Sequence, residues 1–440
     1  MIEYETGDIS SENLTYGGRG YLRLFEKALE LGVSGIHEGA DAKESDLYAV
    51  DTTLKLGETF SLRGEWANSQ TDTTDSRHDG RAWLTEATYQ DSRSSAHLYA
   101  REQQKDFGLG QQASSESGTR KVGGDFSLLV GEPLRIDLEM FTSQDLEDDQ
   151  RRWVGEGSVA YSLDALTLSS GLRHARDEQD NESDAVSNQV LFGANWKLSQ
   201  RLTVTAKHEQ SLGDNDNSDY PTRSLLGIDY GLTEAVDLFV SQELTQGESI
   251  DSEGTRLGLR ARPWDGTQIL TSVEQQLNEN SERAFANLGL SQTWQFSPQL
   301  GVDLSVDRQQ ILTHKREDPD DNGDDEYTAV SSGLSYREAF WSFEGRAELR
   351  IAGEEDRWGV FAGSIVEPQQ DLGLSFSARH AQSDKQDHSW SRDTEIRLGL
   401  AHRPAHRNWL LLERLDLILN AAGDNDSDDE GWRIVNHFNS

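Results

Sequence analysis

The sequence has no cysteine and no long apolar stretch among its 440 residues. The absence of cysteine excludes disulfide bonds and thiolate metal sites. No apolar run approaches the roughly 18 residues that a membrane-spanning helix requires. The N-terminus, MIEYETGDISSENL, is acidic and lacks the basic segment followed by an apolar segment of a signal peptide. We therefore expect an exported form of this protein to be represented here by a mature chain or a fragment.

Basic residues are also scarce. There are 41 Lys and Arg against 79 Asp and Glu, which gives a formal net charge of -38. Such a charge repels phosphates and argues against a nucleic-acid partner, whereas a basic partner or divalent cations stay open. Only 34% of residues are hydrophobic, yet the chain contains 11 Trp. The order of the apolar residues is therefore more informative than their amount.

The stretch SFEGRAELRIA, residues 342 to 352, shows this order. Glu344, Arg346, Glu348 and Arg350 occupy every second position, with apolar or small residues between them. A period of two is that of a β-strand, because successive side chains point to opposite faces, whereas a helix would spread the charges around its axis. The pattern predicts a strand with one apolar and one charged face.

Similar alternation gives about two dozen strand candidates of roughly 9 to 13 residues, with no convincing helix between them. Tight turns join pairs of strands within residues 130–134, 196–202, 296–300 and 338–341. Long acidic links separate the pairs at residues 143–152, 210–221, 317–326 and 421–430. We expect short and long links to alternate from about residue 56 onwards.

The hairpin registers test whether the apolar faces match. A turn at residues 131–133 sets Val130 opposite Leu134 and Leu128 opposite Ile136. The other predicted pairs are Phe126 with Leu138, Phe296 with Leu300, Trp294 with Val302, Tyr336 with Phe343 and Val330 with Leu349. In the last hairpin, Arg337 and small polar residues lie beside the charges of residues 344–350. Each hairpin is predicted to have one dry face and one wet face.

These features predict an all-β fold: an antiparallel up-and-down transmembrane β-barrel of about 24 strands that is not fully closed. We expect a lead-in at residues 1–19 and the barrel at 20–440. Trp196, Trp264, Trp294, Trp341 and Trp409 lie near tight turns, and Trp153, Trp358 and Trp432 follow long links, as expected for two interfacial aromatic belts. The alternative, a soluble sheet with ordinary strand aromatics, leaves no second layer to cover the apolar stripes.

Several segments resemble the C-terminal outer-membrane barrels of very large proteobacterial surface proteins that often carry tandem immunoglobulin-like repeats. These segments are FGLGQQASSESGTRKVGGDF (107–126), SGLRHARDEQDNESDAVSNQVLFGANWKL (170–198), YPTRSLLGIDYGLTEAVDLFVSQELTQGE (220–248), FANLGLSQTWQ (285–295), RWGVFAGSIVEPQQDLGLS (357–375) and RLGLAHRP (397–404). The resemblance runs from about residue 14 to the end and implies fold and location rather than chemistry. Family members continue past WRIVNHFNS (432–440) through several more strands. We therefore expect the last strands to be missing, with an imperfect seam between a first strand near residues 20–32 and the segment after Gly431.

No sequence motif identifies an active site. The sequence has no Gly-x-Ser-x-Gly, His-Glu-x-x-His or phosphate loop, so we expect neither an enzyme nor a cofactor, although a Ser/His pair assembled across the wall stays open. In the acidic link, Asp318, Asp320, Asn322 and Gly323 match the start of a calcium loop, but Ala329 replaces the bidentate Glu. Solvated loops, or cations bridging them to lipopolysaccharide phosphates, are the simpler interpretations.

The sequence therefore predicts an outer-membrane barrel that anchors or displays a larger surface protein, with a wide porin or substrate channel as the alternative. We expect Glu344, Arg346, Glu348, Arg350 and Arg337 to form a charge ladder that lines the lumen. The expected partners are outer-membrane lipid and lipopolysaccharide, divalent cations at the acidic loops and additional domains of the same polypeptide. The short turns should face the periplasm and the long acidic loops the outside.

Overall fold

The computed structural model describes residues 15–40, 43–73, 76–108, 117–148, 150–178, 184–213, 217, 219–247, 251–278, 281–316, 326–404, 409–424 and 428–439. These residues form one 25-stranded sheet. The first strands are β1 (Thr15–Leu24), β2 (Leu29–Ala40), β3 (Lys43–Leu56), β4 (Phe60–Thr73), β5 (Arg77–Gln90), β6 (Ser94–Gln103), β7 (Thr119–Val130), β8 (Leu134–Asp145), β9 (Arg151–Leu163), β10 (Leu166–Glu178), β11 (Ala185–Ser199) and β12 (Leu202–Ser211). The remaining strands are β13 (Thr222–Gly231), β14 (Val236–Gln246), β15 (Ser252–Ala261), β16 (Thr267–Asn278), β17 (Ser281–Gln295), β18 (Leu300–Arg316), β19 (Tyr327–Arg337), β20 (Trp341–Ala352), β21 (Glu355–Gln369), β22 (Leu372–Lys385), β23 (Trp390–His402), β24 (Leu411–Gly423) and β25 (Asp428–Asn439). No helix in the described part of the chain is long and apolar enough to cross a membrane.

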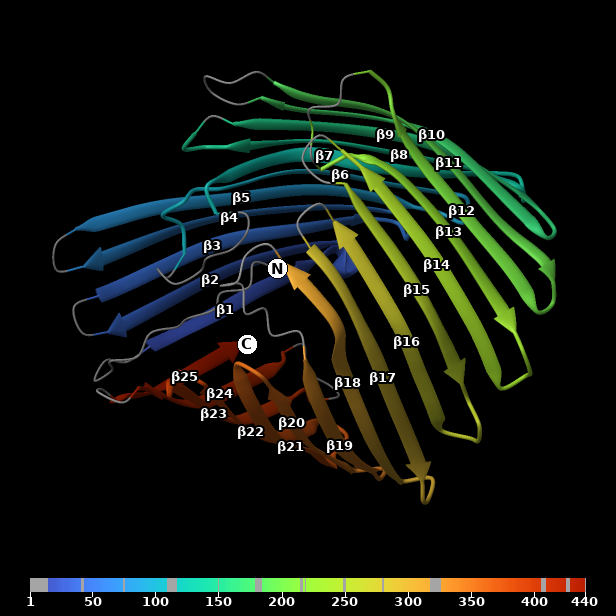
Figure 1. Cartoon of the computed structure of the whole chain (residues 1–440). Helices are drawn as coiled ribbons and strands as arrows, with labels where there is room; N and C mark the ends of the chain where they lie inside the picture. The colour runs from blue at the N-terminus through green and yellow to red at the C-terminus, as the bar shows by residue number, and fades with distance from the viewer. Residues whose placement is uncertain are drawn as a thin grey trace.

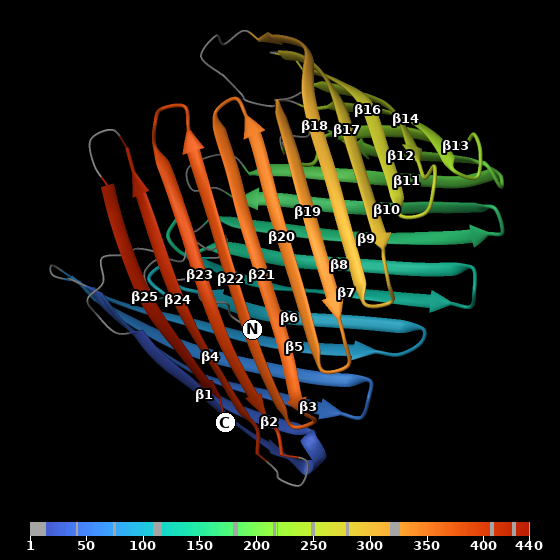
Figure 2. The same ribbon diagram turned by 90° about the horizontal axis from the view of Figure 1, so that it is seen from below.

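Each strand pairs antiparallel with its neighbours in sequence, and the sheet curves until β1 and β25 lie side by side (Figures 1 and 2). At this seam the pairing is parallel and joins residues 15–19 to residues 435–439. The predicted all-β, nearly closed up-and-down barrel is therefore confirmed. The seam is parallel because β1 and β25 both run towards the end of the barrel where the tight turns lie.

The start of the barrel differs from the prediction. The segment expected as one strand at residues 20–32 is divided between β1 and β2 by a 3-10 turn at Phe25–Lys27. All three turn residues have positive φ, from 52° to 77°, without a glycine among them. The turn was missed because its sequence contains none of the residues that favour this backbone conformation. Strand β1 begins at Thr15, so paired structure starts before the expected boundary at residue 20.

The strands are also longer than predicted, at 10 to 17 residues. Strand β8 ends at Asp145 and β9 begins at Arg151, so both ends of the link expected at 143–152 belong to strands and only residues 146–150 remain between them. The link expected at 421–430 is likewise reduced to residues 424–427. The charged residues in these strand ends do not stop backbone pairing, because side chains of a strand point away from the hydrogen-bonded ladder and can remain in water.

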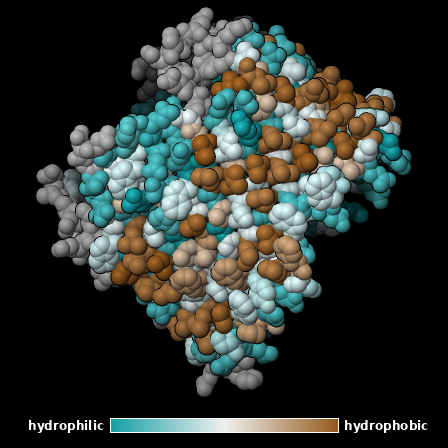
Figure 3. Space-filling view, turned by 60° about the horizontal axis from the view of Figure 1, so that its bottom comes forward, coloured by the Kyte–Doolittle hydropathy of each residue, from teal (hydrophilic) through white to brown (hydrophobic). Residues whose placement is uncertain are grey.

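The predicted hairpin registers are confirmed. Val130 pairs with Leu134, Trp294 with Val302 and Val330 with Leu349. The apolar members of these pairs lie on a face of the sheet that stays exposed, where Leu349 retains 45% of its accessible surface. In the view of Figure 3, apolar side chains spread across this outer surface and hydrophilic ones gather towards its margins. The barrel therefore turns most of its large apolar residues outward instead of burying them in a core.

Candidate functional site: the polar inner wall

The opposite face of the sheet carries the charged side chains. Several ion pairs on this face skip a strand, such as Arg19 of β1 with Asp51 of β3 at 2.8 Å. Arg433 of β25 lies 3.8 Å from Glu38 of β2, across the seam. Side chains can reach over an intervening strand most readily on the concave side of a curved sheet, so this face is the inner wall.

The structure places all five residues of the predicted charge ladder on this polar face. Register sets Glu344 opposite Ser335 and Arg346 opposite Gly333. Arg346 Nε lies 2.5 Å from Glu348 Oε1, and Arg346 also donates a hydrogen bond of 3.3 Å to Ser331 Oγ.

The ladder residues separate into two groups. Arg346, Glu348 and Arg350 line a cavity of about 850 Å3. Glu344 and Arg337 lie nearer the tight turn and do not line this cavity. A selective role for the ladder in ion passage stays a prediction.

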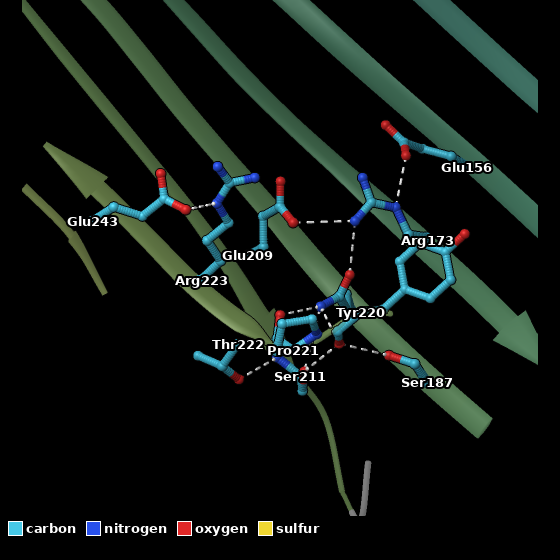
Figure 4. A network of polar contacts seen from close by, with 11 residues as sticks. Glu156, Arg173, Ser187, Glu209, Ser211, Tyr220, Pro221, Thr222, Arg223 and Glu243 are labelled. Atoms are coloured by element: carbon cyan, nitrogen blue, oxygen red, sulfur yellow. Dashed lines mark hydrogen bonds and ion pairs between the residues drawn. The ribbon is translucent and has the colours of Figure 1, made fainter. Parts of the chain in front are cut away.

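A second polar cluster was not predicted from the sequence. Gln189 on β11 is 1% exposed and donates two hydrogen bonds of 2.8 Å, to the backbone oxygens of Tyr220 and Pro221, both of which are labelled in Figure 4. Its side-chain oxygen accepts a bond of 2.9 Å from Arg173, which also binds Glu156 at 2.8 Å. This arrangement holds the end of the β12–β13 link against the inner wall.

Arg173 contributes to the same attachment through its guanidinium, which lies 5.2 Å from the centre of the Tyr220 ring. Burial raises the pKa of the Tyr220 phenol. Nearby, Arg152 binds both Asp177, at 2.7 Å, and Asp219 of the link, at 2.5 Å. Asn217 also donates a bond of 3.1 Å to Asp177. Two arginines of the wall thus hold the described end of this link, residues 219–221, against the inner wall.

The β6–β7 link is attached to the inner wall by apolar contact instead. Phe107 is 3% exposed and belongs to a cluster of buried residues on β3, β4 and β5, namely Leu47, Ala49, Ala67 and Ala82. Gly80 allows this approach, because a Cβ at that position would lie 2.2 Å from the Phe107 nitrogen. Gly108 N then donates a hydrogen bond of 2.8 Å to Ser69. Among the described residues, the polar inner wall therefore carries a dry patch that Phe107 of the β6–β7 link covers.

The five predicted interfacial tryptophans lie at the end of the barrel with the tight turns. Trp196, Trp294 and Trp341 point outward from strand ends, and the Trp341 ring packs at a tilt against Tyr336 with ring centres 4.9 Å apart. Trp264 and Trp409 lie in links. Trp264 donates a hydrogen bond of 2.7 Å to Gln292, and the Trp409 ring lies edge-on to the His402 ring with ring centres 5.3 Å apart. Their membership of a lipid-interface belt stays a prediction.

The Ser/His alternative is represented by His208 and Ser224, whose Nδ1 and Oγ atoms are 2.8 Å apart on the outer face. Three other outward histidines make the same contact with the residue directly opposite on the next strand. The four pairs are His37–Asp46, His174–Asn188, His208–Ser224 and His380–Thr394, at 2.7 to 2.8 Å. The repetition indicates a structural pattern rather than one catalytic pair.

The candidate calcium positions at residues 318–323 lie outside the described residues, whereas Ala329 lies in β19 on the polar face. Within the described residues, no group of three or more His, Asp or Glu is arranged to hold a metal ion.

No family model matches the chain, and no curated protein matches it. Among solved structures, the siderophore receptor PirA of Pseudomonas aeruginosa is 12% identical with a TM-score of 0.50, over 80% of this chain and 75% of that one. A mutant of the ferric enterobactin receptor PfeA from the same organism, in complex with enterobactin, is 10% identical with a TM-score of 0.50, over 83% of this chain and 75% of that one. A triple mutant of Rhodopseudomonas blastica porin matches with a TM-score of 0.32 and 10% identity, over 58% of this chain and 90% of that one. This likeness is too distant to support the assignment of the fold. The chain has the fold of a large outer-membrane β-barrel.

Proposed function

We propose that the chain is the membrane-embedded base of a surface protein, anchored in the outer membrane by the barrel. The observation that carries this proposal is the continuous apolar face of the hairpins, which is exposed and points away from the charged wall. Such a surface is stable in hydrocarbon, where every backbone group must pair within the sheet. The resemblance of the chain to barrels that follow tandem immunoglobulin-like repeats supports a display role.

The anchor proposal is tested by membrane fractionation of a Gram-negative host that exports the chain. We expect it to remain in outer membranes washed with urea or carbonate, and to change mobility on heating in SDS, as folded barrels do. Extraction into the soluble fraction by either wash would contradict an embedded barrel.

A channel is the second candidate, and the charged inner wall with its cavity of about 850 Å3 favours it. Barrel diameter grows with strand number, so a barrel of 25 strands has room for a wide lumen. Conductance of the refolded barrel in a planar bilayer separates the two roles. Steady conductance supports a channel, whereas a silent barrel that still fractionates with the outer membrane supports an anchor alone.

Orientation is part of the same proposal, since tight turns of outer-membrane barrels face the periplasm. A protease added to intact cells should cut within 146–150 or 317–326, in links at the end opposite to the tight turns. Cleavage confined to the turns at 131–133 or 297–299 would reverse the orientation.

A further inference from the structure

Four arginines surround part of the cavity on the inner wall of β20, β21 and β22, three strands that lie side by side (Figure 2). Arg350 and Arg357 are direct cross-strand partners. Further along the same strands, Arg346 and Arg379 lie on either side of Phe361, because both are in register with it. We call these four residues and the wall between them the arginine basin.

The middle of the floor of the arginine basin is made of small residues, whereas Phe361 forms the floor between Arg346 and Arg379. Gly359 and Ala381 are direct partners on β21 and β22, midway between the two arginine rows. Glu348 and Asp393 stand at the sides of this row, in register with Gly359 and Ala381. All four line the cavity together with the arginines. The small residues leave space above the wall, and the long side chains around them carry the charge.

Two of the four arginines are already paired with carboxylates. Arg346 binds Glu348 at 2.5 Å, and Arg357 binds Glu355. Arg350 instead stacks over the Tyr327 ring, with its guanidinium carbon 4.5 Å from the ring centre.

Arg379 has no carboxylate partner among the residues that the structure describes, and neither has Arg350. Glu395, which lies directly opposite Arg379, is bound to Arg397 at 2.6 Å. The arginine basin therefore has two guanidinium groups available to a ligand.

The pairing of Arg350 with Arg357 is unfavourable by itself, because like charges directly opposite each other destabilise a sheet. An anion between the two guanidinium groups would reverse this effect. Guanidinium groups bind carboxylate and phosphate through two parallel hydrogen bonds. The two arginine rows are four residues apart along the strands, which is about 13 Å.

We propose that the arginine basin binds a solute with two or more oxyanion groups, phosphate or carboxylate, which contact Arg350 and Arg357 at one end and Arg379 at the other. The inference rests on the proposed function only in requiring a folded barrel whose lumen is open to water. It holds for an anchor or for a channel.

Titration calorimetry of the refolded barrel in detergent, with tripolyphosphate and citrate as probes, tests this proposal. The test variant carries Arg350→Gln and Arg379→Gln. The matched control is Arg337→Gln, which removes one arginine from the same polar face outside the cavity. We expect the wild type and the control to bind with similar affinity, and the double variant to bind at least about tenfold more weakly, since it loses charge-assisted hydrogen bonds at both ends.

Three results would overturn the proposal: no binding of either probe by the wild type, unchanged binding by the double variant, or an equal loss in the Arg337→Gln control. The mobility shift on heating verifies folding of each variant. If the double variant does not fold, each single variant is measured, and unchanged affinity in both overturns the proposal equally. Membrane fractionation tests the anchor separately, so failure of one proposal is distinguishable from failure of the other.

Discussion

At the scale of single residues, Asp91 organises the tight turn between β5 and β6. Its Oδ1 atom accepts hydrogen bonds of 2.7 Å from the backbone nitrogens of both Arg93 and Ser94, and its Oδ2 accepts one of 2.6 Å from the Tyr89 hydroxyl. The Tyr89 hydroxyl, followed by these two N–H groups, lowers the pKa of Asp91 from 3.8 to about 2. A carboxylate in this position fixes the turn without a glycine or proline.

This shift predicts the pH dependence of an Asp91→Asn variant. Because the pKa is lower in the folded state, the stabilising contribution is fully present above pH 3.8 and is lost as the pH falls through about 2. We expect the urea midpoint of wild type to exceed that of the variant at pH 7, and the difference to shrink as the pH approaches 2. A difference that is constant across this range would contradict the role given to the ionised carboxylate.

The turn between β1 and β2 stores backbone strain at Lys27, which has a φ of 77°. Glycine adopts this conformation without the steric cost that other residues incur, so Lys27→Gly should raise the free energy of unfolding by up to about 1 kcal/mol. The matched control is Gly57→Ala in the next tight turn, where φ is 69° and no other atom lies near the added Cβ. That change should lower stability by about 1 kcal/mol. Urea unfolding in detergent measures both, and changes of the same sign would contradict the argument.

At the scale of the strands, the two faces of the β19–β20 hairpin differ in environment. Leu349 is on the outer face, and Ser335 is on the polar face opposite Glu344. Leu349→Arg should destabilise the barrel by about 2 to 4 kcal/mol if the residue lies near the bilayer midplane, whereas Ser335→Arg should have little effect. Unfolding in lipid vesicles measures both variants. Similar losses for the two would contradict the assignment of faces.

The faces and the hairpin registers could be predicted because they depend on alternation and on where the tight turns fall. Val130 opposite Leu134 follows from a turn only a few residues away. The attachment of Phe107 to Leu47 and of Tyr220 to Gln189 could not be predicted, because these contacts join residues far apart in sequence. Arg379 was likewise not predicted as a site residue, since its place beside the charge ladder requires the registers of β20, β21 and β22 together.

At the scale of the whole molecule, the distribution of charge differs between wall and links. The inner wall carries both signs in close pairs, such as Arg173 with Glu156 and Arg19 with Asp51. Links such as 317–326 and 212–221 are rich in acidic residues and contain no Lys or Arg. These links therefore carry a share of the net charge of -38 that no basic residue of the same link balances. An anionic solute that passes such links would meet repulsion before it reached the arginine basin, and this repulsion would be weaker at higher salt.

The last prediction concerns the seam, where residues 15–19 pair in parallel with residues 435–439. Gly17 and His437 are direct partners, and the natural chain has no cysteine to interfere. A chain carrying Gly17→Cys and His437→Cys should form an intramolecular disulfide in the outer membrane, because paired strands bring Cα atoms within the limit of about 7 Å for such a bond.

The matched control pairs Gly17→Cys with Ile434→Cys, which lies on β25 three residues away from the position opposite Gly17, so it should remain reduced. Mobility on non-reducing gels before and after reduction measures both variants. The same pair placed in a longer polypeptide, with sequence following residue 440, tests the resemblance to longer barrels. If further strands insert at the seam, β25 pairs with one of them instead of β1, and the cross-link should disappear. A cross-link that persists there would show that β1 and β25 form the closing pair in both chains.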